Sequence, residues 1–307
     1  MTLDVYVSIF MTVVIAATPI LIAALGELVV EKSGVLNLGV EGMMLCGAVA
    51  GFSIATTTGA TSGGYLAGAA AGAALSMVFA LLVLSLSANQ VATGLALTIF
   101  GTGVSSLTGR PFVGKTVQRL GPLFPHPLSD HPLLRALFGY DAIVYLSLVL
   151  TVAVAWFLAA SRPGLVLRAV GEGDAAAHAI GHPVIRVRYA AIAFGGALAG
   201  LAGAYYSLAV TPMWADRLTA GRGWIALALV VFAAWRPWRL LAGAYLFGAV
   251  MTLELQSKAA GVGFVPPEFL AMLPYLATVV VLTLIALRGA GGQRAPACLG
   301  KAFRAGG

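Results

Sequence analysis

Asn37 and Glu41 have the residue types and the spacing that suit contact with the hydroxyl groups of a solute. They lie four residues apart at the start of a long apolar stretch, so in a continuous helix they share one face. A carboxylate in such a stretch is costly and usually faces a cavity, a partner or a solute path. The amide and the carboxylate could bind a solute or hold two helices together, and the residues alone leave both interpretations open.

Two further residues are weaker candidates for contact with a solute. Asn89 and Gln90 form a polar pair between two apolar runs, a pattern typical of a tight turn or of the break in a discontinuous helix. Trp224 follows a Gly-Arg-Gly turn. Its ring could stack on a base or sugar face, or pack where a membrane meets water. The expected solute path therefore consists of Asn37, Glu41, Asn89 and Trp224.

The chain lacks the residue sets that catalysis requires. Residues 109–116 fit the phosphate-loop pattern GxxxxGK[ST], but that site needs a preceding strand and a following helix. Here an apolar run precedes the pattern and a proline-rich stretch follows it. His126 and His131, with Asp130, are interpreted as part of an exposed loop, and no HExxH or GxSxG motif occurs. We expect no enzyme, no catalytic residues, no bound metal and no cofactor held by this chain.

The composition indicates a polytopic α-helical membrane protein. Of the 307 residues, 60% are hydrophobic and 9% are charged, whereas a soluble domain carries about 25% charged residues. Several apolar runs reach the length of about 18 residues that crosses a bilayer. The net charge of +7 comes from basic residues scattered at the ends of these runs. Because they form no clustered basic face, we expect no nucleic-acid partner.

The apolar runs predict an all-α fold of about eight to ten spans, including broken or half-helices. The seventh run is short for a crossing and fits a half-helix. Glycines at four-residue spacing, such as Gly64, Gly68 and Gly72 or Gly196 and Gly200, should let helices approach closely. The nine predicted segments cover about residues 6–25, 35–57, 64–86, 91–107, 142–160, 189–210, 224–235, 240–256 and 269–287.

Lysine and arginine predict the orientation, because they are retained on the cytoplasmic side of a membrane. If the polar stretch 161–188 lies on the cytoplasmic side, most of the basic residues of the chain lie on that side too. Nine crossings then put the N-terminus outside and the C-terminus in the cytoplasm, and Arg222 falls in an outer loop. We expect one membrane domain over residues 1–287 and a disordered cytoplasmic tail over 288–307.

The polar stretch 161–188 separates two apolar runs and could contact a soluble partner. Asp174 can cap a short helix over residues 175–180. Gly181 suits the end of that helix, and Pro183 prevents its continuation. About two turns of helix with an alanine-rich face result, over which a groove of another protein could close. An ordinary solvated loop is the alternative.

Four segments of the chain, in order, resemble the ABC importer permeases for branched-chain amino acids and simple sugars. They are residues 26–48, 89–103, 167–208 and 219–237. The nucleoside and simple-sugar branch is the most similar, since its members commonly read ERSGVxNxGxEGMM early in the chain. The likeness extends over about residues 8–287.

The resemblance implies an all-helical permease subunit that works in a pair, often with a non-identical partner. Two cytoplasmic ATPases dock on the coupling loops and use the ATP, and an extracytoplasmic solute-binding protein or lipoprotein delivers the solute. The family's Gly-Glu-x-x-x-Ala-Ala…Gly element maps onto the stretch after Arg168. The residues expected to couple to the ATPase are therefore Arg168, Gly171, Glu172, Ala176, Ala177 and Gly181.

We therefore expect a multi-pass permease of the bacterial inner (plasma) membrane, surrounded by lipid. It would import a nucleoside or a related simple sugar, driven by ATPases through the loop at residues 168–183. The alternative is an ion-coupled secondary transporter of a small polar solute, in which Glu41 and Glu254 would serve as ion sites.

Overall fold

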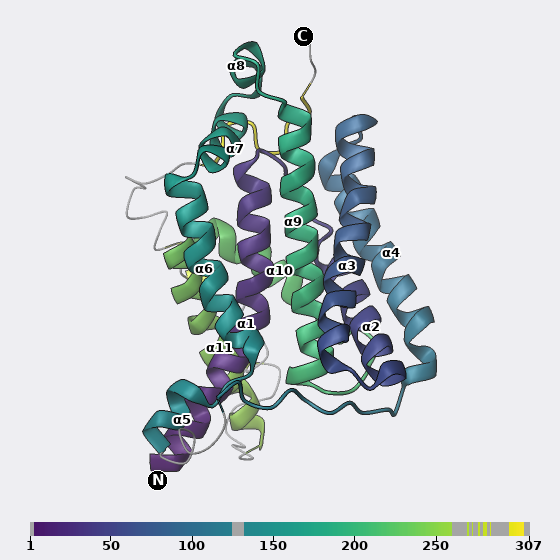
Figure 1. Ribbon diagram of the computed structural model, residues 1–307, viewed down its shortest axis with the longest axis vertical. Helices are drawn as coiled ribbons and strands as arrows, with labels where there is room; N and C mark the ends of the chain where they lie inside the picture. Colours follow the sequence, from purple (N-terminus) through teal and green to yellow (C-terminus); the bar gives the residue numbers. More distant parts are fainter. Residues whose placement is uncertain are drawn as a thin grey trace.

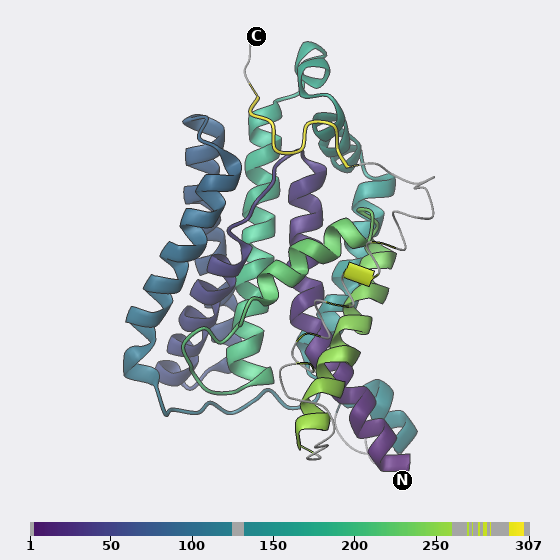
Figure 2. The ribbon, with the colours of Figure 1, turned by 180° about the vertical axis from the view of Figure 1, so that it is seen from behind.

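The computed structural model describes residues 3–124, 132–259 and 295–303, with scattered positions at 269, 272, 276, 279, 280 and 283. Figures 1 and 2 show these residues as an elongated bundle of helices. Seven of the described helices are long and apolar enough to cross a membrane. Their bounds are α1 Leu3–Lys32, α2 Val40–Thr58, α3 Thr61–Ala80, α4 Gln90–Gly109, α6 Ala142–Ala160, α9 Val184–Tyr205 and α11 Pro237–Ala259.

Shorter helical elements connect or extend the long helices. The π-helical turns η1 (Leu81–Ser85) and η3 (Tyr206–Val210) continue α3 and α9, and the 3-10 turn η2 (Arg110–Phe112) continues α4. Eight of the nine predicted apolar segments correspond to described helices, and the ninth, at 269–287, falls outside the described residues apart from the scattered positions. The four short α-helices are α5 Pro132–Phe138, α7 Arg162–Glu172, α8 Asp174–Ala179 and α10 Arg222–Phe232.

The long helices run between two ends of the bundle, named here after the helices found there. The α8 end carries α7, α8 and residues 295–303, whereas the α5 end carries α5 and the start of α1 (Figure 1). The α1–α2 and α3–α4 connections also lie at the α8 end. The backbone N–H of Gly300 donates to the carbonyl of Gly34 (3.2 Å), and the amide of Gln90 donates to the carbonyl of Lys301 (3.3 Å).

Helix α1 forms the centre of the bundle. Residues 17–32 of this helix are all buried, and α1 packs against α6, α9, α10 and α11. A helix that is apolar on every side has no solvent-facing stripe and must be surrounded by other helices or by lipid. The buried carboxylates at the end of α1, Glu27 and Glu31, therefore need partners within the protein.

Close helix packing at the predicted glycines is confirmed for α3 and α9. A side chain at Gly72 would overlap the carbonyl of Gly196, and one at Gly68 would meet the side chain of Ala204. The backbones therefore approach as closely as small residues allow. Gly103 of α4 makes no such close contact, because no atom lies within 4 Å of the position of an added Cβ.

Residues 211–236 cross the bundle by a loop and a half-helix instead of one long helix. The loop starts at the α5 end, where Met213 and Trp214 form β-bridges with Thr116 and Val113. Helix α10 then spans only 11 residues and lies obliquely across the middle of the bundle (Figure 2). The predicted half-helix is thus confirmed, although it begins at Arg222 and ends at Phe232.

The second crossing is also broken, and this corrects the predicted start of its helix. Helix α2 begins at Val40, and its N-cap residue is Gly39. The preceding connection is not helical, so Asn37 and Glu41 do not share a helix face. Gly34, in the same connection, has a φ of +88°, a conformation that glycine adopts without strain.

The polar stretch between α6 and α9 contains two helices, of which the sequence predicted one. The missed helix, α7, starts after Ser161, whose side chain accepts a hydrogen bond from the N–H of Gly164 (3.0 Å). Pro163 occupies its first turn, a position that proline favours. The buried side of α7 includes Leu167 and Val170, which dock it against the bundle.

Candidate functional site

Helix α8 has the length that the sequence predicted and is followed by the predicted turn at Gly181, but it begins and ends one residue earlier, at Asp174 and Ala179. It ends in a left-handed turn in which Gly181 has a φ of +92°. The N–H of His182 donates to the carbonyl of Ala177, and the N–H of Gly181 to that of His178; these two bonds define a Schellman cap. Asp174 is the first helical residue instead of the N-cap, a position that Gly173 takes.

The carboxylate of Asp174 pairs with Arg188, the last residue of the polar stretch 161–188. Arg188 is fully buried, and its Nη2 lies 3.0 Å from Oδ2 of Asp174. Its Nε donates to the carbonyl of Ser33 at 3.1 Å. One guanidinium therefore links the start of α8 and the start of α9 to the α1–α2 connection.

The six predicted coupling residues divide into exposed and buried groups. Glu172, Ala176 and Gly181 are exposed, so a partner protein could reach them. Ala177 is buried against Val170 and Val184.

Gly171 is buried, and an added Cβ there would overlap the carbonyl of Lys32. Gly171 and Ala177 thus hold α7 and α8 in place against the bundle. Arg168 is half-buried and lines a separate pocket.

The tail was predicted to be disordered, and residues 295–303 correct that prediction. The N–H of Cys298 donates to the carbonyl of Gly171 (2.9 Å), and the ring of Phe303 lies 5.4 Å from that of His178. Together with the bonds at Gly300 and Lys301 described above, these contacts make residues 295–303 a strap. The strap joins α7 and α8 to the α1–α2 and α3–α4 connections.

Glu41 lies buried where the starts of α2 and α10 meet. Its carboxylate accepts hydrogen bonds from Thr219 Oγ1 (2.5 Å), the N–H of Gly221 (2.9 Å) and the N–H of Gly223 (2.6 Å). The N-terminus of a helix favours a negative charge, so α10 stabilises this carboxylate. Of the two interpretations left open, the structure favours the one in which Glu41 holds two helices together.

Asn37 is fully buried and holds the connection between α1 and α2. Its Oδ1 accepts from the N–H of Gly39 (2.9 Å), and its Nδ2 lies 3.5 Å from Sδ of Met43. Its backbone N–H donates to Oε1 of Glu27 (3.2 Å). These contacts leave the side chain amide engaged within the protein.

Asn89 and Trp224 lie apart from this buried cluster. Asn89 is exposed at the α8 end, where its side chain caps α4 by accepting from the N–H of Ala92 (3.0 Å); the turn interpretation is therefore the right one. Its neighbour Gln90 is buried and accepts from the N–H of Leu36 (2.8 Å).

Trp224, in the first turn of α10, keeps 36% of its surface exposed. Arg222, which was expected in a loop, is the first residue of α10, and its guanidinium lies over the ring of Tyr206, 4.7 Å from its centroid.

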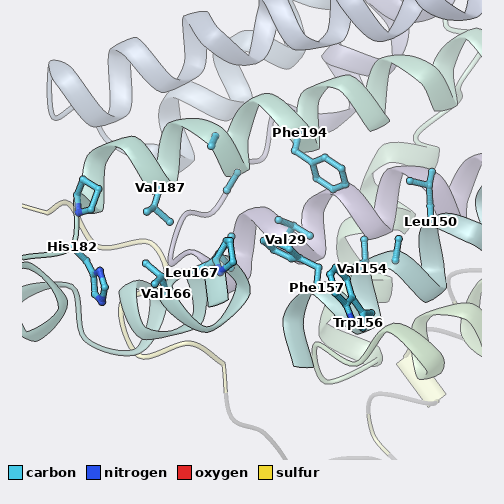
Figure 3. Close-up of a pocket in the computed structure, with 15 residues that line it drawn as sticks. Val29, Leu150, Val154, Trp156, Phe157, Val166, Leu167, His182, Val187 and Phe194 are labelled. Carbon is cyan, nitrogen blue, oxygen red and sulfur yellow. The ribbon is translucent and has the colours of Figure 1, made fainter. Parts of the chain in front are cut away.

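A large cavity between α6, α7 and α9 does not suit a hydroxylated solute. It has a volume of about 700 Å³, and Figure 3 shows Val154, Phe157, Val187 and Phe194 on its walls. Almost all of the lining is apolar, and the polar ring of His182 lies at one end (Figure 3). Such a surface offers too few hydrogen-bond partners for hydroxyl groups.

The phosphate-loop pattern does not have the structure that nucleotide binding needs. It follows the long helix α4, forms the turn η2 and then continues without a helix at the α5 end. The site lacks the helix N-terminus that would face a phosphate. His126, Asp130 and His131 lie outside the described residues. Within the described part of the chain, no three His, Cys, Asp or Glu side chains are grouped to hold a metal ion.

Comparison with known proteins gives one family and several relatives that cover most of the chain. The model of the branched-chain amino acid transport system permease component matches residues 9–285. The putative glucose ABC transporter permease protein TsgC13 of Haloferax volcanii is 42% identical, over 89% of this chain and 90% of that protein. The guanosine permease NupQ of Bacillus subtilis is 31% identical, over 87% and 88%. The nucleoside permease NupC of Lactococcus lactis is 29% identical, over 88% and 89%.

Proposed function

The chain belongs to the family of branched-chain amino acid transport system permease components, and from this we propose that it imports a nucleoside or a related simple sugar. It is a multi-pass membrane subunit of an ABC transporter of the sugar and nucleoside type, not an enzyme. Such a permease works with ATPase subunits and a substrate-binding partner. We further propose that it pairs with a second permease subunit and that the ATPases drive it through α8.

The observation that carries the coupling route is the exposed face of α8 together with its buried attachment. Ala175, Ala176 and Ile180 are exposed. The two alanine side chains are short enough for a groove of an ATPase to close over the helix. Asp174, on the attached side, is tied through Arg188 to the carbonyl of Ser33. Force applied to α8 therefore reaches α1 and α2 through short, buried contacts.

Further contacts connect α8 to the broken crossings. Ser33 begins the connection that holds Asn37, and this connection leads into α2 at Glu41. Glu41 in turn fixes the start of α10. Movement of α8 can thus shift two broken crossings together, provided that ATP biases the equilibrium between two arrangements of the bundle.

Broken helices often border the solute path of a transporter, and Trp224 is an exposed candidate path residue that lies on one, the half-helix α10. We therefore propose Trp224 as a contact for the sugar or base, on a face shared with the second permease subunit. Asn37 and Glu41 are buried, and in this proposal they hold the helices that form the wall of the path without contacting the solute. Asn89 caps α4 at the α8 end, and we assign it no solute contact in this proposal. In this proposal the α8 end faces the cytoplasm, and the α5 end faces the substrate-binding protein.

The names of the relatives support a solute that contains a sugar, since two refer to guanosine or nucleosides and one to glucose. The test is uptake into proteoliposomes that hold the permease pair and its ATPase, with the substrate-binding protein outside. Labelled guanosine and labelled glucose should be compared, each with ATP or a non-hydrolysable analogue inside. ATP-dependent uptake of either solute supports the proposal. Uptake driven by a proton or sodium gradient without ATP would instead establish the secondary transporter.

A further inference from the structure

A second pocket, at the α8 end, concentrates positive charge. Its volume is about 420 Å³, and four basic side chains from three parts of the chain line it. Lys32 ends α1, Arg168 belongs to α7, and Arg236 and Arg239 lie at the start of α11. The side chains of these four residues take no part in the hydrogen bonds described above that attach α8 to the bundle.

The carboxylates of the described residues do not fully neutralise these four charges. Among the described residues, Arg188–Asp174 is the ion pair that the structure contains, so none of the four contacts a carboxylate. Glu172 is close enough to Lys32 to interact electrostatically. Glu31 also lies nearby, but its carboxylate accepts a hydrogen bond from Nε1 of Trp235 (2.6 Å). Two carboxylates thus face four cations.

Arg168, which lines the same pocket, also carries a hydrogen-bond donor without a partner in the protein. Its Nε is buried and has no hydrogen-bond partner, a state that costs free energy unless a ligand or water satisfies it.

The walls of the pocket match a lipid more closely than a free ion. Ala155, Leu158 and Ala159 of the membrane helix α6 form its apolar side, and Trp235 and Trp238 border it. Tryptophan is enriched at the level of lipid headgroups, and basic pockets at that level bind phosphate-bearing lipids. An acyl chain could follow α6 while the phosphate enters the pocket.

We propose that the pocket formed by Lys32, Arg168, Arg236 and Arg239 binds the phosphate of an anionic phospholipid. The ligand chemistry is a phosphate ester whose oxygens accept hydrogen bonds from the guanidinium groups. The bound headgroup joins α7 to the turn between α10 and α11, beside the coupling helices. Lipid bound there becomes part of the surface around the proposed ATPase contact.

The test measures lipid binding to the purified, delipidated full-length permease by native mass spectrometry. Phosphatidylglycerol and phosphatidylcholine are titrated separately, and inorganic phosphate forms a third arm. Each surface cation contributes about fivefold to binding of an anionic lipid, so R236Q/R239Q should bind phosphatidylglycerol about 25-fold more weakly. The variant R236K/R239K keeps the charge and should remain within about fivefold of the wild type. The variant R110Q/K115Q removes two exposed charges at the α5 end and should bind as the wild type does.

Three outcomes would overturn the proposal. The first is phosphatidylglycerol binding that R236Q/R239Q leaves unchanged, or that R110Q/K115Q weakens equally. The second is binding of inorganic phosphate without any preference for phosphatidylglycerol over phosphatidylcholine, which would assign the pocket to a free anion. The third is loss of lipid from the assembled transporter together with a crosslink from position 239 to the ATPase, which would assign the pocket to an acidic segment of that partner.

Discussion

Asp174 and Arg188 form an ion pair, 3.0 Å between Oδ2 and Nη2, that fastens the first residue of α8 to the start of α9. Arg188 is fully buried, and 18% of the Asp174 side chain is exposed. The pair therefore lies at the boundary between the exposed helix α8 and the buried bundle. This position makes it the natural point at which movement of α8 enters the membrane domain.

Removing the charge of Asp174 should weaken this attachment. In D174N the buried guanidinium loses its charged partner, which should lower the free energy of unfolding by about 1–3 kcal/mol. In proteoliposomes the variant should hydrolyse more ATP for each solute molecule imported. The control D216N changes an exposed carboxylate in the loop before α10 and should behave as the wild type. A wild-type ratio of ATP to solute in D174N would argue against the route through Arg188.

A bulky residue on the exposed face of α8 should block docking without affecting folding. In A176W the new ring points away from the core, so the free energy of unfolding should change by less than about 0.5 kcal/mol. Solute-dependent ATP hydrolysis and uptake should both fall strongly. A60W places the same ring at an exposed position of the α5 end and should transport normally. Full activity of A176W would remove α8 from the ATPase contact.

The role of Glu41 can be separated from a role in solute binding. Three donors converge on its carboxylate, so E41A leaves them unsatisfied and should cost about 3 kcal/mol or more of folding stability. Thermal unfolding of the purified permease measures this loss. In material that folds, the ratio of guanosine to glucose uptake should not change. A stable E41A protein with altered selectivity would contradict the structural role.

A glycine pair tests the packing of the membrane helices. An alanine at Gly72 would push against the carbonyl of Gly196, so G72A should destabilise the permease by about 1–3 kcal/mol. An alanine at Gly103 meets no atom within 4 Å. Because alanine has a higher helix propensity than glycine, G103A should leave the stability of the permease unchanged or raise it by up to about 1 kcal/mol. Equal unfolding temperatures for the two variants would refute close packing at Gly72.

The sequence was most informative where local composition decides the structure. The apolar run predicted over residues 142–160 coincides with α6, because an uninterrupted apolar run has few alternatives to a membrane helix. The turn at Gly181 followed from a residue type with a specific backbone requirement. Helix α10 was recognisable as a half-helix because its apolar run is too short to cross a bilayer.

The contacts that join distant parts of the chain could not be predicted in this way. Arg188 bonds to Ser33, 155 residues earlier, and no local pattern selects that partner. Asn37 was placed on a helix because its neighbours are apolar, although Gly34 and Gly39 around it signalled an interruption. The tail is rich in glycine and alanine, which suggested disorder, but its backbone bonds to Gly171 and Gly34 depend on folded surfaces that only the tertiary structure provides.

The strap also has a consequence for biosynthesis. Residues 295–303 follow every described helix in the chain, so a ribosome makes α7, α8 and the connections at Gly34 and Gln90 before the residues that join them. The surface around α8 therefore reaches its final shape only after those late residues have emerged. An ATPase that recognises this completed surface would not bind nascent chains that lack the strap. The transporter would therefore assemble only after the strap has been synthesised.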